Sequence, residues 1–202
     1  MKKVLIVCFE PFGGELRNPA WDVLSTFKYN SRDDVILSNI VLPCIFSDSK
    51  SIILGRLNKE DYDAIIIFAQ AGGRWDINLE RLSINFIDSP IPDNNGIKIV
   101  DDEVETEGPS AYFSTLPIKK IVKQLRDNNI PASVSNNAGT FLCNYIFYTL
   151  LHHAAESKRK TSIGVVHIPY TPEQVVYRPG VPYMSEEVIV KALVHIITNC
   201  IS

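Results

Sequence analysis

The stretch DAIIIFAQAGGR at residues 63–74 decides the fold. Its core, Ala64–Ala69, has no polar residue, so both faces of the strand it predicts must be buried. The Gly72-Gly73 pair then ends the strand with a turn. A strand that is buried on both faces is typical of a sheet between two layers of helices.

Short apolar runs and segments of helical period alternate on both sides of this stretch. We expect strands at Lys3–Phe9, Val35–Leu42, Ala64–Ala69, Leu82–Ile87, Ala132–Ser135 and Ile163–Ile168. We expect helices at Pro19–Lys28, Ser47–Leu57, Pro117–Asn128, Cys143–Glu156 and Ser185–Thr198, the last with Ser185 as its N-cap. The alternation predicts a three-layer α/β/α sandwich with a largely parallel central sheet, in a single domain over residues 1–202.

Residues Ser89–Pro109 interrupt the alternation. The segment contains an Asn95-Gly96 turn signal and five acids between Asp101 and Glu107, and it predicts a protruding hairpin or loop. Its acids lack the spacing of an EF-hand, so we expect a solvated face rather than a metal site.

Charge and hydropathy exclude several classes of protein. The net charge of −3 over 202 residues argues against a nucleic-acid binder, which would be basic. No apolar stretch approaches the roughly 18 residues that span a membrane. The apolar run Val4–Cys8 meets Glu10-Pro11 without a cleavage site, so it predicts a first strand rather than a signal peptide. We expect a cytoplasmic protein with reduced thiols and neither a nucleic-acid nor a membrane partner.

Cys143 is the candidate nucleophile. It follows Asn137–Leu142, a predicted strand-to-helix turn in which Thr140 is the expected N-cap. In the first turn of a helix, unpaired N–H groups and the dipole stabilise a thiolate and can bind an oxyanion. A buried cysteine without a function is an equal alternative on position alone. The other cysteines lie in apolar runs or near the chain end and are expected to be structural: Cys8, Cys44 and Cys200.

His167 is the candidate base. It closes the apolar run that starts at Ile163, at the carboxyl end of a predicted strand, where α/β sheets place ligand sites. His152 and His153 lie nine and ten residues beyond Cys143 on one predicted helix, about 14 Å away at 1.5 Å per residue. His195 is expected to pack within the last helix. A structural role stays open for His167.

Glu80 is the candidate for the third group that orients the imidazole of a Cys–His pair. The loop after Ala69 also leaves the sheet at its carboxyl end, which is where His167 is predicted. A surface ion pair between Glu80 and Arg81 is the alternative. Gly72-Gly73 fits neither of the glycine patterns that bind nucleotide phosphates.

Motif blocks in a shared order and spacing carry a resemblance over Val4 to about Ile197. The blocks are Phe9–Gly14 with Asn18-Pro19, Gln70–Arg74 with Leu79–Arg81, Ile91–Asn94, Ser114–Pro117, Ala138–Asn144 and His167–Pro169. Taken together they resemble the pyroglutamyl-peptidase I family of cysteine peptidases. The resemblance implies removal of an N-terminal pyroglutamyl residue from a peptide by a triad of Cys143, His167 and Glu80.

The resemblance also implies a binding site and an assembly. Its substrate-binding positions fall on Phe9, Phe12, Asn18, Gln70, Ile91, Phe141 and Leu142. A small aromatic slot with a few polar groups suits a neutral five-membered lactam. No metal or organic cofactor is implied, and the family suggests a homo-oligomer, commonly a tetramer.

Four residues depart from the family pattern. Pro90 stands where the family usually carries an arginine that is associated with the oxyanion, and proline supplies no backbone N–H. Val7-Cys8 replaces a Thr-Gly pair, and Cys44 stands at a usual threonine of the pocket. These changes touch the pocket rather than the triad, and they imply slower turnover or a related cyclic amide as substrate.

Three alternative functions stay open. A related thiol hydrolase or acyltransferase would use the same triad on another small amide or ester. A binding homologue would keep the pocket after losing turnover. A phosphorylase-like enzyme would hold phosphate at the carboxyl end of the sheet, but the motif blocks contain no cluster of Arg or Lys apart from Arg74. Arg74 and Arg81 are otherwise expected to be structural salt-bridge partners.

Overall fold

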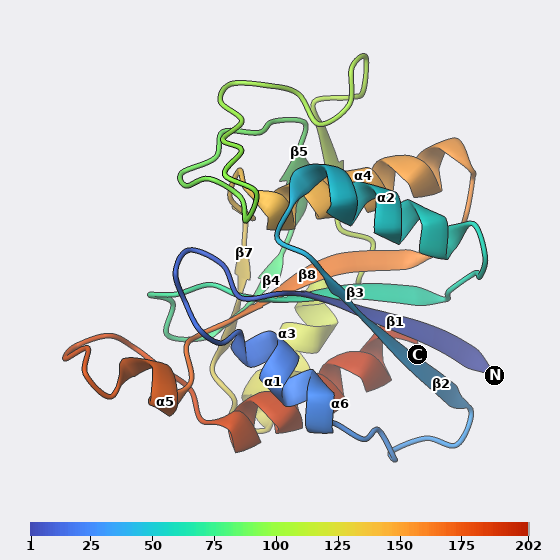
Figure 1. Cartoon of the computed structure of the whole chain (residues 1–202). Coiled ribbons are helices and arrows are strands. Elements are labelled where there is room, and N and C mark those ends of the chain that lie inside the picture. The colour runs from blue at the N-terminus through green and yellow to red at the C-terminus, as the bar shows by residue number, and fades with distance from the viewer. Residues whose placement is uncertain (202) are drawn as a thin grey trace.

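A six-stranded sheet forms the centre of the structure, a computed structural model that describes residues 1–201 (Figure 1). In spatial order its strands are β2 (Val35–Leu42), β1 (Lys2–Phe9), β3 (Ala64–Gln70), β8 (Ser162–Ile168), β4 (Ile77–Glu80) and β7 (Ala132–Ser135). Strands β2, β1, β3 and β8 are parallel, whereas β4 is antiparallel to β8, and β7 is parallel to β4. The expected mostly parallel central sheet is confirmed.

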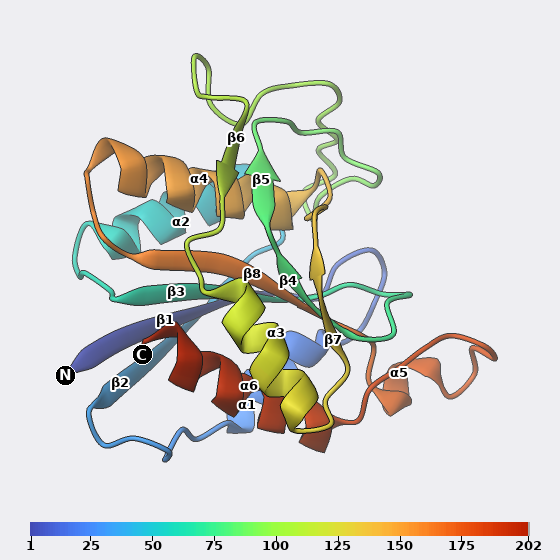
Figure 2. The ribbon, with the colours of Figure 1, turned by 180° about the vertical axis from the view of Figure 1, so that it is seen from behind.

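Helices cover both faces of this sheet (Figures 1 and 2). One face carries α1 (Pro19–Thr26), α3 (Ile118–Asp127) and α6 (Glu186–Cys200), and the other carries α2 (Phe46–Leu57) and α4 (Leu142–Glu156). The short helix α5 (Pro172–Val175) lies to one side of these layers. The three-layer α/β/α sandwich expected from the alternation of elements is therefore confirmed.

Strand β3 shows why two helical layers are needed. Ile66 and Phe68 belong to the apolar cluster under α1, α3 and α6, whereas Ile65 and Ile67 belong to the cluster under α2 and α4. Successive side chains of a strand point to opposite faces, so an all-apolar strand can be buried only between two layers. Each of these side chains is almost fully buried, which stabilises the fold by about 1.5–3 kcal/mol per side chain.

The predicted strand Leu82–Ile87 is corrected by the structure. Only β5 (Leu82–Ile84) is a strand, and it pairs with β6 (Ala111–Phe113) in a separate two-stranded sheet. The sheet strand of this region is β4, which the sequence analysis placed in a loop. Strand β4 has only four residues, two of them polar, so it lacks the apolar run that marks the other central strands.

The segment Ser89–Pro109 protrudes from the sandwich as an irregular hairpin beyond α2 and α4 (Figure 1). Ile87 pairs with Asp102 as an isolated antiparallel bridge, and Ser89 donates to the Ile99 carbonyl at 2.8 Å. Gly96 has a φ of +80°, which favours glycine at the tip of the turn. Within residues 1–201, no helix is long and apolar enough to cross a membrane.

Candidate active site

His167 and Glu80 meet near the carboxyl end of β8. Asn78 of β4 is the register partner of His167, so Glu80, two residues further along β4, presents its side chain on the same face. His167 Nδ1 lies 2.8 Å from Glu80 Oε1, and the two side chains are only 5% and 0% exposed. When Nδ1–H donates to the carboxylate, Nε2 is left to accept a proton. The pair has the arrangement of a base and the group that orients it.

The alternative of a surface ion pair between Glu80 and Arg81 is wrong. Glu80 is fully buried, and its cationic partner is Arg74, whose Nη1 donates to Oε1 at 2.7 Å. The Nε of Arg81 donates instead to the side chain of Asn136 at 2.7 Å. The register of β4 turns Glu80 inward and thereby separates it from its sequence neighbour.

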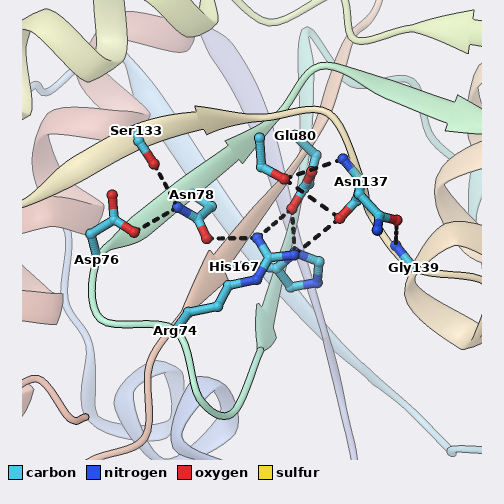
Figure 3. A network of polar contacts seen from close by, with 9 residues as sticks. Arg74, Asp76, Asn78, Glu80, Ser133, Asn137, Gly139 and His167 are labelled. Carbon is cyan, nitrogen blue, oxygen red and sulfur yellow. Dashed lines mark hydrogen bonds and ion pairs between the residues drawn. The ribbon is translucent and has the colours of Figure 1, made fainter.

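A polar network extends from Glu80 along β4 (Figure 3). Arg74 Nη1 also donates to Asn78 Oδ1 at 2.6 Å, and the Asn78 amide group donates to Asp76 and to Ser133, both at 2.8 Å. Asp76, Asn78 and Ser133 were not among the site residues predicted from the sequence. The signal that could have found the first two is the period-two spacing of Asp76, Asn78 and Glu80, which predicts a strand with one polar face.

Cys143 lies in the first turn of α4, as the sequence predicted. Its N-cap residue, however, is Phe141 and not Thr140, whose hydroxyl donates to the carbonyl of Asp88 at 2.7 Å. No side chain of the described residues caps α4, so its first N–H groups have no helical or side-chain partner. These groups and the half-buried thiol leave an anion-binding position at the start of the helix.

The loop that delivers Cys143 is held by short-range hydrogen bonds. The Asn137 side chain accepts a hydrogen bond from the Gly139 amide at 2.9 Å, and the Ser135 hydroxyl accepts one from the Asn137 amide at 3.2 Å. Gly139 has a φ of +80°, a conformation that a residue with a Cβ rarely adopts. These contacts fix the backbone of the turn between β7 and α4, and they thereby fix the position of Cys143 in the first turn of α4.

Cys143 packs against the same apolar cluster as Ala69 and Val165, which is on the α2 and α4 side of the sheet. His167 follows Val165 by two residues on β8 and so faces the same side. Within residues 1–201 the structure records no hydrogen bond between Cys143 and His167. Catalytic hydrogen bonds are often long before substrate binds and tighten only in the complex with substrate.

The electrostatics favour an uncharged Cys143 and an uncharged His167 at rest. Burial raises the pKa of the Cys143 thiol, and the charge of Glu80 raises it further, while Arg74 acts in the opposite direction. Burial lowers the pKa of His167 although Glu80 acts to raise it. The helix N-terminus was expected to favour a thiolate, but removal from water outweighs it for this buried thiol. The site therefore favours transfer of the thiol proton to His167 during attack over a preformed ion pair.

Glu80 remains ionised in this environment. Burial acts to raise the pKa of its carboxyl, but the hydrogen bond and charge of His167, together with the hydrogen bond from Arg74, hold that pKa below its usual value. An ionised Glu80 stabilises an imidazolium when His167 takes a proton. The arrangement thus suits a base that becomes charged only during the reaction.

We expect the buried histidine to destabilise the fold in acid. The folded-state pKa of His167 is below the unfolded value of 6.5, so the unfolded chain binds more protons between the two values. The stability that a neutral His167 contributes is complete above pH 6.5 and is lost as the pH falls toward the folded pKa. Urea unfolding of the wild type and of His167→Gln between pH 5 and 8 tests this, because the wild type should lose up to about 1.4 kcal/mol more per pH unit. If the free energy of unfolding changed with pH in the same way in both proteins, the expected effect of His167 on acid stability would be wrong.

The aromatic residues that the sequence assigned to substrate binding lie together. The rings of Phe12 and Phe141 are 6.1 Å apart between centroids, and Phe9 belongs to the same apolar cluster. Phe46 packs edge-on against Phe141 at 5.5 Å and against Tyr145 at 5.2 Å. Phe46 and Tyr145, which are both buried, were not among the predicted substrate-binding residues, because helix periodicity alone does not show which aromatic side chains pack together.

Ile91 and Leu142 lie on two different segments, the protruding segment and the start of α4. Ile91 approaches the loop after Phe12 so closely that a Cβ on Gly13 would lie 3.1 Å from its Cδ1. Leu142 is buried beside Cys143 in the first turn of α4. The protruding segment is tied to the pocket by Asn94, which donates to the carbonyls of Pro11 at 3.0 Å and of Cys44 at 2.8 Å.

Asn18 and Gln70 shape the loops around the pocket. Asn18 is the N-cap of α1: its Oδ1 accepts from the Ala20 amide at 3.1 Å, and its Nδ2 donates to the Phe9 carbonyl at 2.8 Å. These bonds fix the two ends of the loop that carries Phe12. Gln70, at the end of β3, accepts from Gln174 at 2.9 Å. The polar groups of Asn18 are thus engaged by the backbone, which is a positioning role.

No group of three or more His, Cys, Asp or Glu side chains within residues 1–201 is arranged to hold a metal ion. The side chains that the site does bring together are a thiol, an imidazole, a buried carboxylate and a guanidinium. Together with a helix N-terminus, this set of groups can attack a carbonyl carbon and stabilise the oxyanion that forms.

Comparisons with known proteins identify similar chains. The family model described as pyroglutamyl peptidase matches residues 2–202. Pyrrolidone-carboxylate peptidase 1 of Caldanaerobacter subterraneus subsp. tengcongensis is 43% identical over 191 residues, covering 95% of this chain and 94% of that protein. Pyrrolidone-carboxylate peptidase of Bacillus licheniformis is 43% identical over 192 residues, covering 95% and 89%.

Solved structures agree with these relatives. A mutant pyrrolidone carboxyl peptidase from Pyrococcus furiosus superposes with a TM-score of 0.94 at 40% identity, covering 98% of this chain and 97% of that one. Pyroglutamyl peptidase I of Bacillus amyloliquefaciens gives a TM-score of 0.93 at 37% identity, covering 100% and 97%. The similarity thus extends over nearly the whole fold.

Proposed function

The chain belongs to the pyroglutamyl peptidase family of cysteine omega peptidases, and we propose that it removes N-terminal pyroglutamyl residues with Cys143, His167 and Glu80 as its catalytic triad. The single observation that carries the triad is the buried pair of His167 and Glu80, 2.8 Å apart, on the sheet face against which Cys143 packs. Within the pair, the carboxylate fixes the imidazole and leaves Nε2 as the base.

The reaction begins with proton transfer from the Cys143 thiol to His167 as the sulfur attacks the pyroglutamyl carbonyl carbon. The new C–S bond forms a tetrahedral intermediate, whose oxyanion is stabilised by the N–H groups at the start of α4. His167 then gives its proton to the leaving amine as the C–N bond breaks, which produces a thioester on Cys143. Glu80 stabilises the imidazolium that exists between these two proton transfers.

Water completes the cycle. His167 takes a proton from a water molecule that attacks the thioester carbonyl, the C–S bond breaks, and the proton returns to the sulfur. Pyroglutamate is released and the neutral thiol is restored. The raised pKa of Cys143 and the lowered pKa of His167 support this cycle, since both groups are uncharged at its start.

The aromatic group formed by Phe9, Phe12, Phe46 and Phe141 supports a lactam as substrate. A five-membered lactam has apolar CH₂ groups that such rings bury, and it carries no charge that would need an ionic partner. A charged N-terminal residue would lose its hydration in this group without a counterion.

Hydrolysis of pyroglutamyl-aminocoumarin tests the proposal, with prolyl-aminocoumarin as the matched control because it has the same ring without the lactam carbonyl. We expect release of aminocoumarin from the first substrate alone, and loss of that activity after iodoacetamide labels Cys143. Labelling of Cys143 without turnover of the pyroglutamyl substrate would favour a thiol hydrolase of other specificity. Pyroglutamate binding that survives in Cys143→Ser, without turnover, would favour a binding homologue.

We expect Pro90→Arg to increase turnover. Position 90 lies between Asp88, whose amide donates to the carbonyl of Thr140 in the loop before α4, and Ile91, which touches the loop of Phe12. The family resemblance implies an arginine at this position that is associated with the oxyanion, and a donor to an oxyanion is worth about 10²–10³-fold in kcat. Steady-state kinetics should show kcat rising more than KM falls, the signature of a contact made in the transition state. An unchanged kcat would count against this account of Pro90, and Pro92→Arg serves as a control for added charge.

A further inference from the structure

Arg74 contacts both halves of the proposed catalytic apparatus. Its Nη1 donates to Glu80 Oε1 at 2.7 Å, and its Nη2 donates to the Asn137 carbonyl at 3.0 Å, in the loop that leads to Cys143 (Figure 3). We propose that Arg74 is a positioning residue that holds the Glu80 carboxylate and the loop before Cys143 in one arrangement. This inference rests on the proposed function and adds to it a residue outside the triad.

The shape of the guanidinium explains why this position needs arginine. Two nitrogens in a rigid plane reach acceptors on different elements, Glu80 on β4 and Asn137 after β7. A third acceptor, Asn78 Oδ1 at 2.6 Å, fixes the plane of the guanidinium against β4. A lysine ammonium has a similar charge but no fixed plane, so it cannot hold both elements in the same way.

The Asn78 side chain that accepts from Arg74 is itself held by hydrogen bonds. The Asn78 amide is itself held by Asp76 and Ser133, so the acceptor that it offers to Arg74 cannot rotate away without breaking two hydrogen bonds. The Arg74 side chain is 26% exposed, whereas Glu80 is fully buried. The partly exposed cation therefore pairs with a carboxylate that is itself removed from water, where their hydrogen bond is stronger than it would be in solvent.

Glu80 Oε1 accepts from both Arg74 and His167, at 2.7 and 2.8 Å. Because the two donors share one oxygen, Arg74 fixes the rotation of the carboxylate, and the carboxylate fixes the imidazole. A carboxylate released from Arg74 could turn about its terminal torsion, which is broad and has little barrier of its own. The imidazole would then lose the orientation that its hydrogen bond to Glu80 Oε1 gives it.

The charge of Arg74 acts on the same groups. It opposes protonation of His167, whose pKa burial already lowers and Glu80 raises, and it lowers the pKa of the Cys143 thiol. The charged and titratable groups that act on His167 are Glu80 on β4 and Arg74 on the loop before it, with the Cys143 thiol on α4 feeling the same two charges. Removal of the charge is therefore visible in the titration of His167, which a purely structural role would leave unmoved.

The experiment compares Arg74→Met, which removes the charge and all three contacts, with Arg74→Lys, which keeps the charge. Arg81→Met is the matched control, because Arg81 bonds to Asn136 in the same loop but not to Glu80. Steady-state kinetics on pyroglutamyl-aminocoumarin are measured from pH 5 to 9. The imidazole of His167 is titrated by NMR, and the rate of Cys143 alkylation by iodoacetamide is measured at pH 7.

We expect Arg74→Met to lower kcat by about 10²-fold, with KM within threefold, since small misplacements of catalytic groups cost this much. The acid limb of kcat/KM and the NMR titration of His167 should both move to higher pH, and alkylation should slow severalfold. Arg74→Lys should lower kcat by about tenfold and leave the acid limb in place, because the charge remains. Arg81→Met should stay within twofold of the wild type.

The outcome that overturns the inference is an Arg74→Met protein with wild-type kcat, or one whose loss is matched by Arg81→Met while the His167 titration is unchanged. If Arg74→Met fails to fold, the kinetics of Arg74→Lys test the inference in its place. A wild-type kcat in Arg74→Lys would then overturn the inference. A wild-type protein that does not cleave the pyroglutamyl substrate overturns the proposed function instead. The NMR titration and the alkylation rate still measure the role of Arg74 in that case.

Discussion

Cys143→Ala abolishes hydrolysis of pyroglutamyl-aminocoumarin in our expectation, with kcat reduced by about 10⁴-fold or more. The reason is chemical: without the sulfur no thioester forms, and the remaining N–H groups of α4 and the pocket supply only binding and oxyanion stabilisation. Initial rates at saturating substrate measure the loss. Substrate binding should change little, since the predicted substrate-binding residues are unchanged. It is measured as KM or, where turnover is too slow for KM, as the Kd of pyroglutamate.

Cys200→Ala is the matched control for this substitution. Cys200 is buried at the end of α6, in the apolar cluster on the other face of the sheet from α4. The substitution Cys200→Ala removes the same atom as Cys143→Ala, so it tests for a general effect of removing a thiol from the interior. If Cys143→Ala were as active as Cys200→Ala, Cys143 could not be the nucleophile.

Glu80→Gln is expected to lower kcat by about 10³ to 10⁴-fold while the protein remains folded. The amide keeps the size of the side chain but not its charge, so it no longer stabilises an imidazolium at His167. It also offers an N–H group where Arg74 and His167 both need an acceptor, which permits the wrong imidazole tautomer. The loss should be smaller than that of Cys143→Ala, because the nucleophile and the base are both retained.

The same substitution should lower the free energy of unfolding by about 1–3 kcal/mol, because hydrogen bonds to a buried charge are broken and Arg74 loses its counterion. Urea unfolding measures this term apart from activity, and kcat is determined where the variant is fully folded. Glu103→Gln, an exposed carboxylate on the protruding segment, controls for the change in net charge. A Glu80→Gln protein with kcat within tenfold of the wild type would rule out the orienting role.

The sheet was predictable from particular runs of sequence. Val4–Phe9 and Ala64–Ala69 are apolar throughout, and such runs are stable only when helices cover both faces, so the sandwich follows from the hydrophobic effect. Strand β4 was not predictable in the same way. It is short, carries Asn78 and Glu80 among apolar residues, and is held by pairing with β8 and β7, which are distant in the sequence.

The start of α4 was predicted only in part. The strand-to-helix transition before Cys143 was predicted from the turn at Gly139, but the N-cap was assigned to Thr140 on local propensity. In the structure the Thr140 hydroxyl bonds to Asp88, a contact across the chain that no local rule contains. Propensity is a weak prior that a tertiary hydrogen bond overrides at small cost.

What the sequence alone determined is what depends on local pattern and on motif order: the layered α/β class, the position of Cys143 in the first turn of a helix, and the family. The tertiary structure decided which charges meet and in what state. It paired Glu80 with Arg74 and not with Arg81, and it removed His167 and the half-buried thiol of Cys143 from water far enough that both are uncharged at rest. The physical reason is that pairing register and removal from water arise only when distant segments pack together, and these two effects set the orientation and the pKa of every group at the site.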